Sequence, residues 1–84
     1  METRKGKVTE LHEEHDGWRF EVEVLTPAWK VNHAEIILPG EEIDLDLLFL
    51  EKGDPQKEES YSLPGSMKEE PPFAVGDEVT VRFT

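Results

Sequence analysis

The stretch Phe73-Ala-Val-Gly-Asp-Glu-Val-Thr-Val-Arg-Phe-Thr84 decides the fold of this chain. After the turn signal Gly76-Asp77, apolar and polar residues alternate strictly. The apolar set is Val79, Val81 and Phe83, and the polar set is Glu78, Thr80 and Arg82. Such alternation is typical of a half-buried antiparallel strand, because successive side chains point to opposite faces of a sheet. The stretch therefore predicts a closing strand with one face on a hydrophobic core.

The opening of the chain predicts a β-hairpin. Lys5 to Leu11 is one strand candidate, and Trp18 to Val24 is a second, in which apolar and charged residues alternate. The polar segment His12-Glu-Glu-His-Asp-Gly17 lies between them and ends in Asp-Gly, a pair that favours positive φ angles in turns. Two strands joined by a short polar loop are typical of an antiparallel hairpin.

The middle of the chain predicts shorter strands separated by proline and glycine. Thr26-Pro27 ends the hairpin, because proline has no amide hydrogen to donate to a strand ladder. Ala28 to His33 fits either an irregular crossover or one helical turn. The strand candidates are Ala34 to Leu38, Glu42 to Glu51 and Glu59 to Leu63, with turn signals at Pro39-Gly40, Lys52 to Pro55 and Leu63 to Gly65, and a polar linker over residues 66–72.

Together these segments predict an all-β fold, a small antiparallel barrel of five or six strands that occupies residues 1–84 as a single domain. No long amphipathic helix is expected, and closure into a barrel removes exposed sheet edges. With its opening hairpin and its closing Val-Gly-Asp-x-Val-x-Val pattern, the chain resembles OB-like and SH3-like barrels. The predicted core is Val8, Trp18, Phe20, Val22, Val24, Ile43, Leu45, Leu47, Val79, Val81 and Phe83.

The composition is that of a small acidic protein without cysteine. Its 84 residues include 20 acidic and 9 basic side chains, for a net charge of −11, and neither a disulfide nor a thiolate zinc site is expected. Acidity favours solubility or a basic partner and disfavours binding to a phosphate backbone. No apolar run approaches the roughly 20 residues of a membrane span, and the first eight residues lack a signal-peptide core. We expect a cytoplasmic location and no membrane partner.

The densest set of metal-capable side chains is His12-Glu13-Glu14-His15-Asp16, whose imidazoles and carboxylates suit zinc. His33 adds a third imidazole if the crossover folds back. A hairpin tip does not hold ligands in fixed geometry without further hydrogen bonds to orient them. We therefore expect a solvated loop there, with no metal and no cofactor.

A second acidic group runs along the strand candidate that begins at Glu42. It consists of Glu41, Glu42, Asp44 and Asp46. Paired carboxylates can perform acid–base chemistry or bind calcium, but the i, i+2 spacing is also that of the solvated face of a strand. No nucleophile motif or glycine-rich phosphate loop accompanies it. We expect a solvated face and a protein that is not an enzyme.

Leu48 and Leu50 interrupt that polar face, and they are the strongest signal for a partner in the sequence. Since Ile43, Leu45, Leu47 and Phe49 point the other way, this end of the strand is apolar on both sides. Trp29 or the strand around Tyr61 covers the second side, or that side is exposed as an interaction patch. The predicted interaction patch is Leu48, Leu50, Trp29 and Tyr61.

The basic residues suggest a different surface. In many small barrels the first strand neighbours the second and one of the last, which would bring together Arg4, Lys5, Lys7, Arg19 and Arg82. With Trp18 and Trp29 nearby, such a face would be an OB-type platform for nucleic acid. Several glutamates fall on the same strands, which weakens this alternative. The sequence thus favours a non-enzymatic protein-interaction module with a protein partner that has a basic surface, and leaves nucleic-acid binding as the alternative.

Overall fold

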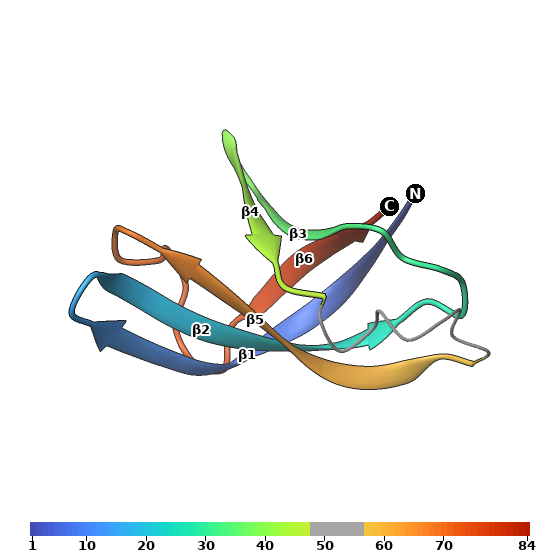
Figure 1. Cartoon of the computed structure of the whole chain (residues 1–84), viewed down its shortest axis with the longest axis horizontal. Helices are drawn as coiled ribbons and strands as arrows, with labels where there is room; N and C mark the ends of the chain where they lie inside the picture. The colour runs from blue at the N-terminus through green and yellow to red at the C-terminus, as the bar shows by residue number, and fades with distance from the viewer. Residues whose placement is uncertain (48–56) are drawn as a thin grey trace.

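The computed structural model describes residues 1–47 and 57–84 of the chain as six antiparallel strands (Figure 1). They are β1 (Glu2–Glu14), β2 (Gly17–Thr26), β3 (Ala34–Leu38), β4 (Glu41–Leu45), β5 (Glu59–Met67) and β6 (Glu78–Phe83). Within these two ranges the chain forms no helix, so no helix there is long and apolar enough to cross a membrane. The expected all-β, antiparallel fold is confirmed.

The strands form one sheet in the order β4-β3-β6-β1-β2-β5. The sheet curls strongly into a half-barrel, so the edge strands β4 and β5 approach each other (Figure 1). The Asp46 amide, one residue beyond β4, donates a 2.8 Å hydrogen bond to the Pro64 carbonyl of β5. This bond joins the two edges of the sheet, which leaves less strand edge free to pair with another chain.

The core lies on the inner face of the curled sheet. Its members are Val8, Phe20, Val22, Val24, Ala34, Ile36, Ile43, Leu45, Leu63, Phe73, Val79, Val81 and Phe83. Phe20 and Phe73 pack edge to face, with ring centroids 5.1 Å apart. Of the predicted core residues, Leu47 is only partly buried against the core. Trp18 is half-buried outside it, because it lies beside the turn at the far end of the hairpin.

A β-bulge at Thr9 divides β1. Val8 pairs with Val22, but Glu10 pairs with Glu21, so β1 holds one extra residue between these two positions. A bulge of this kind reverses the faces on which successive side chains lie. The even-numbered side chains of β1 therefore point inward before Thr9 and outward after it. Leu11, which follows the bulge, packs against the core.

The loop expected over residues 12–17 is much shorter than predicted. His12, Glu13 and Glu14 continue β1, and only His15 and Asp16 form the turn before β2. His12, Glu13 and Glu14 each pair with a residue of β2, so the ladder continues to the end of the hairpin. These three polar residues therefore have the backbone hydrogen bonds of a strand.

The triplet Leu63-Pro64-Gly65, expected to end a strand, lies inside β5. Proline is tolerated there because β5 is an edge strand with a ladder on one side only. The packing of the core explains why residue 65 is glycine. A Cβ atom at this position would lie 2.5 Å from Cζ of Phe20, so the glycine leaves room for that ring. Conversely, β4 ends at Leu45, earlier than predicted, and the remainder of the long strand candidate from Leu48 lies outside the described residues.

Candidate functional site

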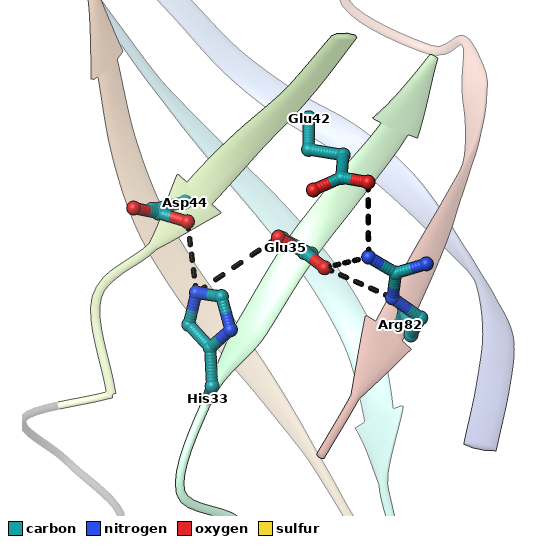
Figure 2. Close-up of polar contacts among 5 residues, drawn as sticks. All are labelled: His33, Glu35, Glu42, Asp44 and Arg82. Atoms are coloured by element: carbon teal, nitrogen blue, oxygen red, sulfur yellow. Dashed lines mark hydrogen bonds and ion pairs between the residues drawn. The ribbon is translucent and has the colours of Figure 1, made fainter. Parts of the chain in front are cut away.

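Two groups of ionisable side chains lie on the outer face of the sheet, and the first is centred on Arg82. Strand pairing places Glu35 of β3 between Asp44 of β4 and Arg82 of β6. Directly paired residues share one face of a sheet, as do residues two apart along a strand. His33 and Glu42 therefore lie on the same face. We call these residues the Arg82 cluster: His33, Glu35, Glu42, Asp44 and Arg82 (Figure 2).

Within the Arg82 cluster, the guanidinium joins two carboxylates. Arg82 Nε donates a 2.9 Å hydrogen bond to Glu35 Oε1, and Nη2 contacts the same oxygen. Arg82 Nη2 also lies 3.1 Å from Glu42 Oε1. The Glu35 side chain is only 7% exposed. Chiefly through its hydrogen bond with Glu35, this environment raises the pKa of Arg82, so its charge is secure.

The imidazole of His33 occupies the other side of the buried carboxylate. His33 Nε2 lies 2.8 Å from Asp44 Oδ1 and 4.0 Å from Glu35 Oε2. Figure 2 shows the ring directed at both carboxylates, opposite Arg82. Among residues 1–47 and 57–84, this trio is the one group of three or more His, Cys, Asp or Glu side chains whose ligand atoms all lie within 4.8 Å of one another.

The second group lies on the outer face of the β1–β2 hairpin. Glu10 pairs with Glu21, and His12 pairs with Arg19. With Glu14, two residues further along β1, they form what we call the hairpin cluster: Glu10, His12, Glu14, Arg19 and Glu21. These five residues, together with Phe20 and Pro64, line a shallow hollow of about 280 Å³.

The hairpin cluster holds two carboxylates side by side. The pKa of Glu21 is raised, first by a hydrogen bond shared with Glu10, then by partial burial and by the neighbouring negative charge. Arg19 lowers that pKa to a lesser degree, and its own ion pair with Glu14 has an N–O distance of 3.7 Å. The Arg19 side chain is 63% exposed. Arginine therefore compensates the carboxylates of this cluster only weakly.

The metal-capable residues predicted at the hairpin tip do not converge. His12 and Glu14 lie on the outer face of β1, whereas His15 and Asp16 form the turn. His33 does not join them; it meets Asp44 instead. The sequence pattern does not identify the trio His33, Glu35 and Asp44, because it leaves Ala28 to His33 open between an irregular crossover and one helical turn. The signal was present, since a two-residue turn at Pro39-Gly40 places Glu35 opposite Asp44.

The five basic residues of the predicted nucleic-acid face come from three adjacent strands, since β1 pairs with both β2 and β6. Four of the five, all except Lys7, have other side-chain partners. Arg4 is bound by Glu2 and Glu58, and alternation places it on the opposite face from Lys5 and Lys7. Lys5 donates a hydrogen bond to Thr80, and Lys7 is paired in register with Glu23 and Glu78. Arg19 forms a long ion pair with Glu14, and Arg82 binds Glu35 and Glu42.

The predicted interaction patch is described only in part, because Leu48 and Leu50 lie outside the described residues. Trp29 and Tyr61 are both half-buried against the core. The Trp29 indole nitrogen lies 3.4 Å from Glu2 Oε1, and the Tyr61 hydroxyl donates a 2.7 Å hydrogen bond to Glu59. The large apolar side chains exposed in the described ranges are Met1, Leu25 and Val75, which lie on separate segments.

Comparison of the chain with protein-family models, with curated proteins and with solved structures finds no match. The two clusters themselves are therefore the basis for inferring a function. The resemblance to OB-like and SH3-like barrels therefore stays a prediction.

Proposed function

We propose that the protein is a non-enzymatic interaction module that binds a basic segment of a partner protein at the hairpin cluster. The observation that carries this proposal is the direct pairing of Glu10 with Glu21 on an exposed face of the sheet. Like charges directly opposite each other in a sheet are destabilising. A lysine or arginine side chain from a partner, seated between them, would convert this repulsion into attraction.

The surroundings of the pair support a cationic ligand. The hollow is lined by three carboxylates and one guanidinium, a net charge of −2 with neutral His12. Elsewhere on this face, Glu23 of β2 and Glu78 of β6 each lie in register with Lys7 of β1. The uncompensated pair is thus a local feature of the hollow. Opposite charge also accelerates encounter between proteins and fixes their relative orientation.

A protein partner is better supported than nucleic acid. Binding to nucleic acid draws its affinity largely from lysine and arginine contacts with phosphates. In this chain Arg4 and Arg82 are each held by two carboxylates, and the net charge is −11. Repulsion between the chain and a phosphate backbone would oppose any contact made by the remaining lysines.

Separate fluorescence titrations test the proposal, one with a labelled peptide of eight alternating lysine and glycine residues and one with a short labelled single-stranded RNA. We expect the peptide to bind at low salt and the RNA to show no binding, because only the peptide has a charge opposite to that of the hollow. The double variant Glu10→Gln/Glu21→Gln should bind about tenfold more weakly, as two exposed ion pairs worth about 0.7 kcal/mol each would predict.

The matched control is Glu41→Gln/Glu70→Gln, which removes the same charge from exposed positions outside the hollow. Its affinity for the peptide should change by less than about twofold, because diffuse surface charge contributes little to a specific contact. Equal losses in the two double variants would contradict a defined site. Direct binding of the RNA, weakened by salt, would favour the nucleic-acid alternative instead.

A further inference from the structure

We propose that His33, Glu35 and Asp44 form a binding site for a divalent transition-metal ion, for which Zn²⁺ is the best match. Imidazole nitrogen and carboxylate oxygen are both ligand types that Zn²⁺ takes in proteins, and their mixture distinguishes the trio from a merely acidic surface. The site lies on β3 and β4, apart from the hairpin cluster, and is independent of the proposed peptide binding.

The distances fit a metal ion at the centre of the trio. Ligands that bind a tetrahedral Zn²⁺ at 2.0–2.2 Å lie about 3.4 Å from one another. In the structure, His33 Nε2 is 2.8 Å from Asp44 Oδ1 and 4.0 Å from Glu35 Oε2. One distance must lengthen and the other must shorten by about half an ångström. The side chains of His33 and Asp44 are 45% and 79% exposed, so both have room for that adjustment.

Glu35 is the fixed member of the trio. Its side chain is 93% buried, and Arg82 binds Oε1, so Oε2 is the oxygen that faces His33 (Figure 2). Metal-binding carboxylates and imidazoles are commonly oriented by such hydrogen bonds from a second residue, whose loss weakens metal affinity by about 10–100-fold. Arg82 would therefore act as a positioning residue that holds the buried ligand ready.

The charge of the cluster also favours a divalent cation. Three carboxylates and one guanidinium give the Arg82 cluster a net charge of −2 with neutral His33. A Zn²⁺ ion would neutralise it. The exposed side of Asp44 leaves coordination positions for water or for a group from a partner, which is the arrangement of a three-ligand, open zinc site.

Isothermal titration of the full chain with Zn²⁺ tests the proposal. We expect saturable binding of one ion per chain with a micromolar or lower Kd. Asp44→Asn should weaken the affinity at least tenfold, and His33→Ala should abolish binding of the single ion. Both residues are largely exposed, so these variants are expected to fold, and circular dichroism can verify it. The visible absorption of bound Co²⁺ gives a second readout of the same ligands.

The controls are Asp16→Asn and His15→Ala, which make the same chemical changes at exposed positions in the β1–β2 turn. They should leave Zn²⁺ affinity within about twofold of the unmodified chain, since neither lies in the trio. Absence of a saturable one-to-one phase would overturn the proposal. So would a phase that persists in His33→Ala or that disappears in His15→Ala, because it would place the ion elsewhere.

Discussion

The hairpin cluster and the Arg82 cluster contain the same types of group, namely three carboxylates, one arginine and one histidine, yet they are organised differently. In the Arg82 cluster, the arginine binds two of the acids and the histidine meets the third. In the hairpin cluster, two acids lie directly opposite each other, and the arginine forms a long ion pair with Glu14. The comparison shows that the electrostatic character of a surface depends on which residues face each other, and that composition alone does not determine it.

Strand register is the cause of this difference. Arg82 lies directly opposite Glu35, so pairing brings unlike charges together. In the hairpin, the bulge at Thr9 places Glu10 opposite Glu21 and leaves Arg19 opposite His12. Cross-strand neighbours contribute roughly 0.2–1 kcal/mol, with a sign set by their charges. The three acids of the Arg82 cluster are therefore stabilised, whereas two of the three acids of the hairpin cluster repel each other.

The largest expected effect is that of a core substitution, which tests whether the two clusters unfold together. Phe20→Ala should destabilise the protein by about 3–5 kcal/mol, because it removes a buried ring that packs against Phe73. Thermal unfolding followed by NMR should show the ring signals of His12 and His33, one from each cluster, disappearing together at a lower temperature. Leu25→Ala, at an exposed position of β2, is the control and should change little. Survival of the His33 signals alone would show that the two halves of the sheet unfold separately.

The second effect separates the two arginines. Arg82→Gln should lower the melting temperature by roughly 5 °C or more, because Glu35 stays buried without its guanidinium partner. Arg19→Gln should lower it by no more than about 2 °C, because its ion pair is long and exposed. In the double variant Arg82→Gln/Glu35→Gln part of the loss should be recovered. Equal melting temperatures for the two single variants would mean that the buried ion pairs of Arg82 contribute no more to stability than the exposed ion pair of Arg19.

The smallest effect concerns the repulsion in the hairpin and depends on pH. Because the pKa of Glu21 is raised in the folded protein, folding favours its protonated form, and this stabilisation is lost as pH rises through the folded-state pKa. Glu21→Gln should therefore raise the melting temperature by roughly 1–3 °C at pH 7. The gain should vanish at acid pH, below the folded-state pKa of Glu21, because the protonated carboxyl carries no charge to repel its neighbour.

Glu23→Gln is the control for Glu21→Gln, because its melting temperature should change in the opposite direction. Glu23 pairs with Lys7 in register, so its replacement removes an attraction and should lower the melting temperature slightly at pH 7. If both glutamine variants change the melting temperature in the same direction, the effect reflects net charge and not the pairing of Glu10 with Glu21.

Much of the fold could be predicted from the sequence, because alternation identifies strands and their buried faces. The segments Ala34 to Leu38 and Glu78 to Phe83 were located closely in this way. Other features depend on tertiary contacts that no local pattern contains. The bulge at Thr9 and the inclusion of Pro64 in an edge strand are determined by neighbouring strands. Phe73 and Leu63 are also core residues, although the sequence pattern places Phe73 at the start of the closing strand and Leu63 at the end of another strand.

The candidate sites were less predictable than the fold for the same reason. Each cluster joins residues from different strands, and their meeting depends on register, which shifts by one residue at the bulge. In the β3–β4 hairpin the register follows from the tight turn in which Gly40 adopts a φ of 80°. The pairing of Glu35 with Asp44 was therefore accessible from sequence, whereas the pairing of Glu10 with Glu21 was not.

The bulge at Thr9 also determines which changes in the length of β1 the chain can accept. Loss of Thr9 itself would keep Val8 opposite Val22 and Glu10 opposite Glu21, so Glu10 and His12 would stay on the outer face and Leu11 on the inner face. Regular pairing that kept every residue would instead place Thr9 opposite Glu21 and would turn Glu10 and His12 inward and Leu11 outward. In evolutionary terms, β1 should accept deletion of Thr9, whereas a change that removed the bulge without shortening the strand would destroy the hollow and the core next to it in one step.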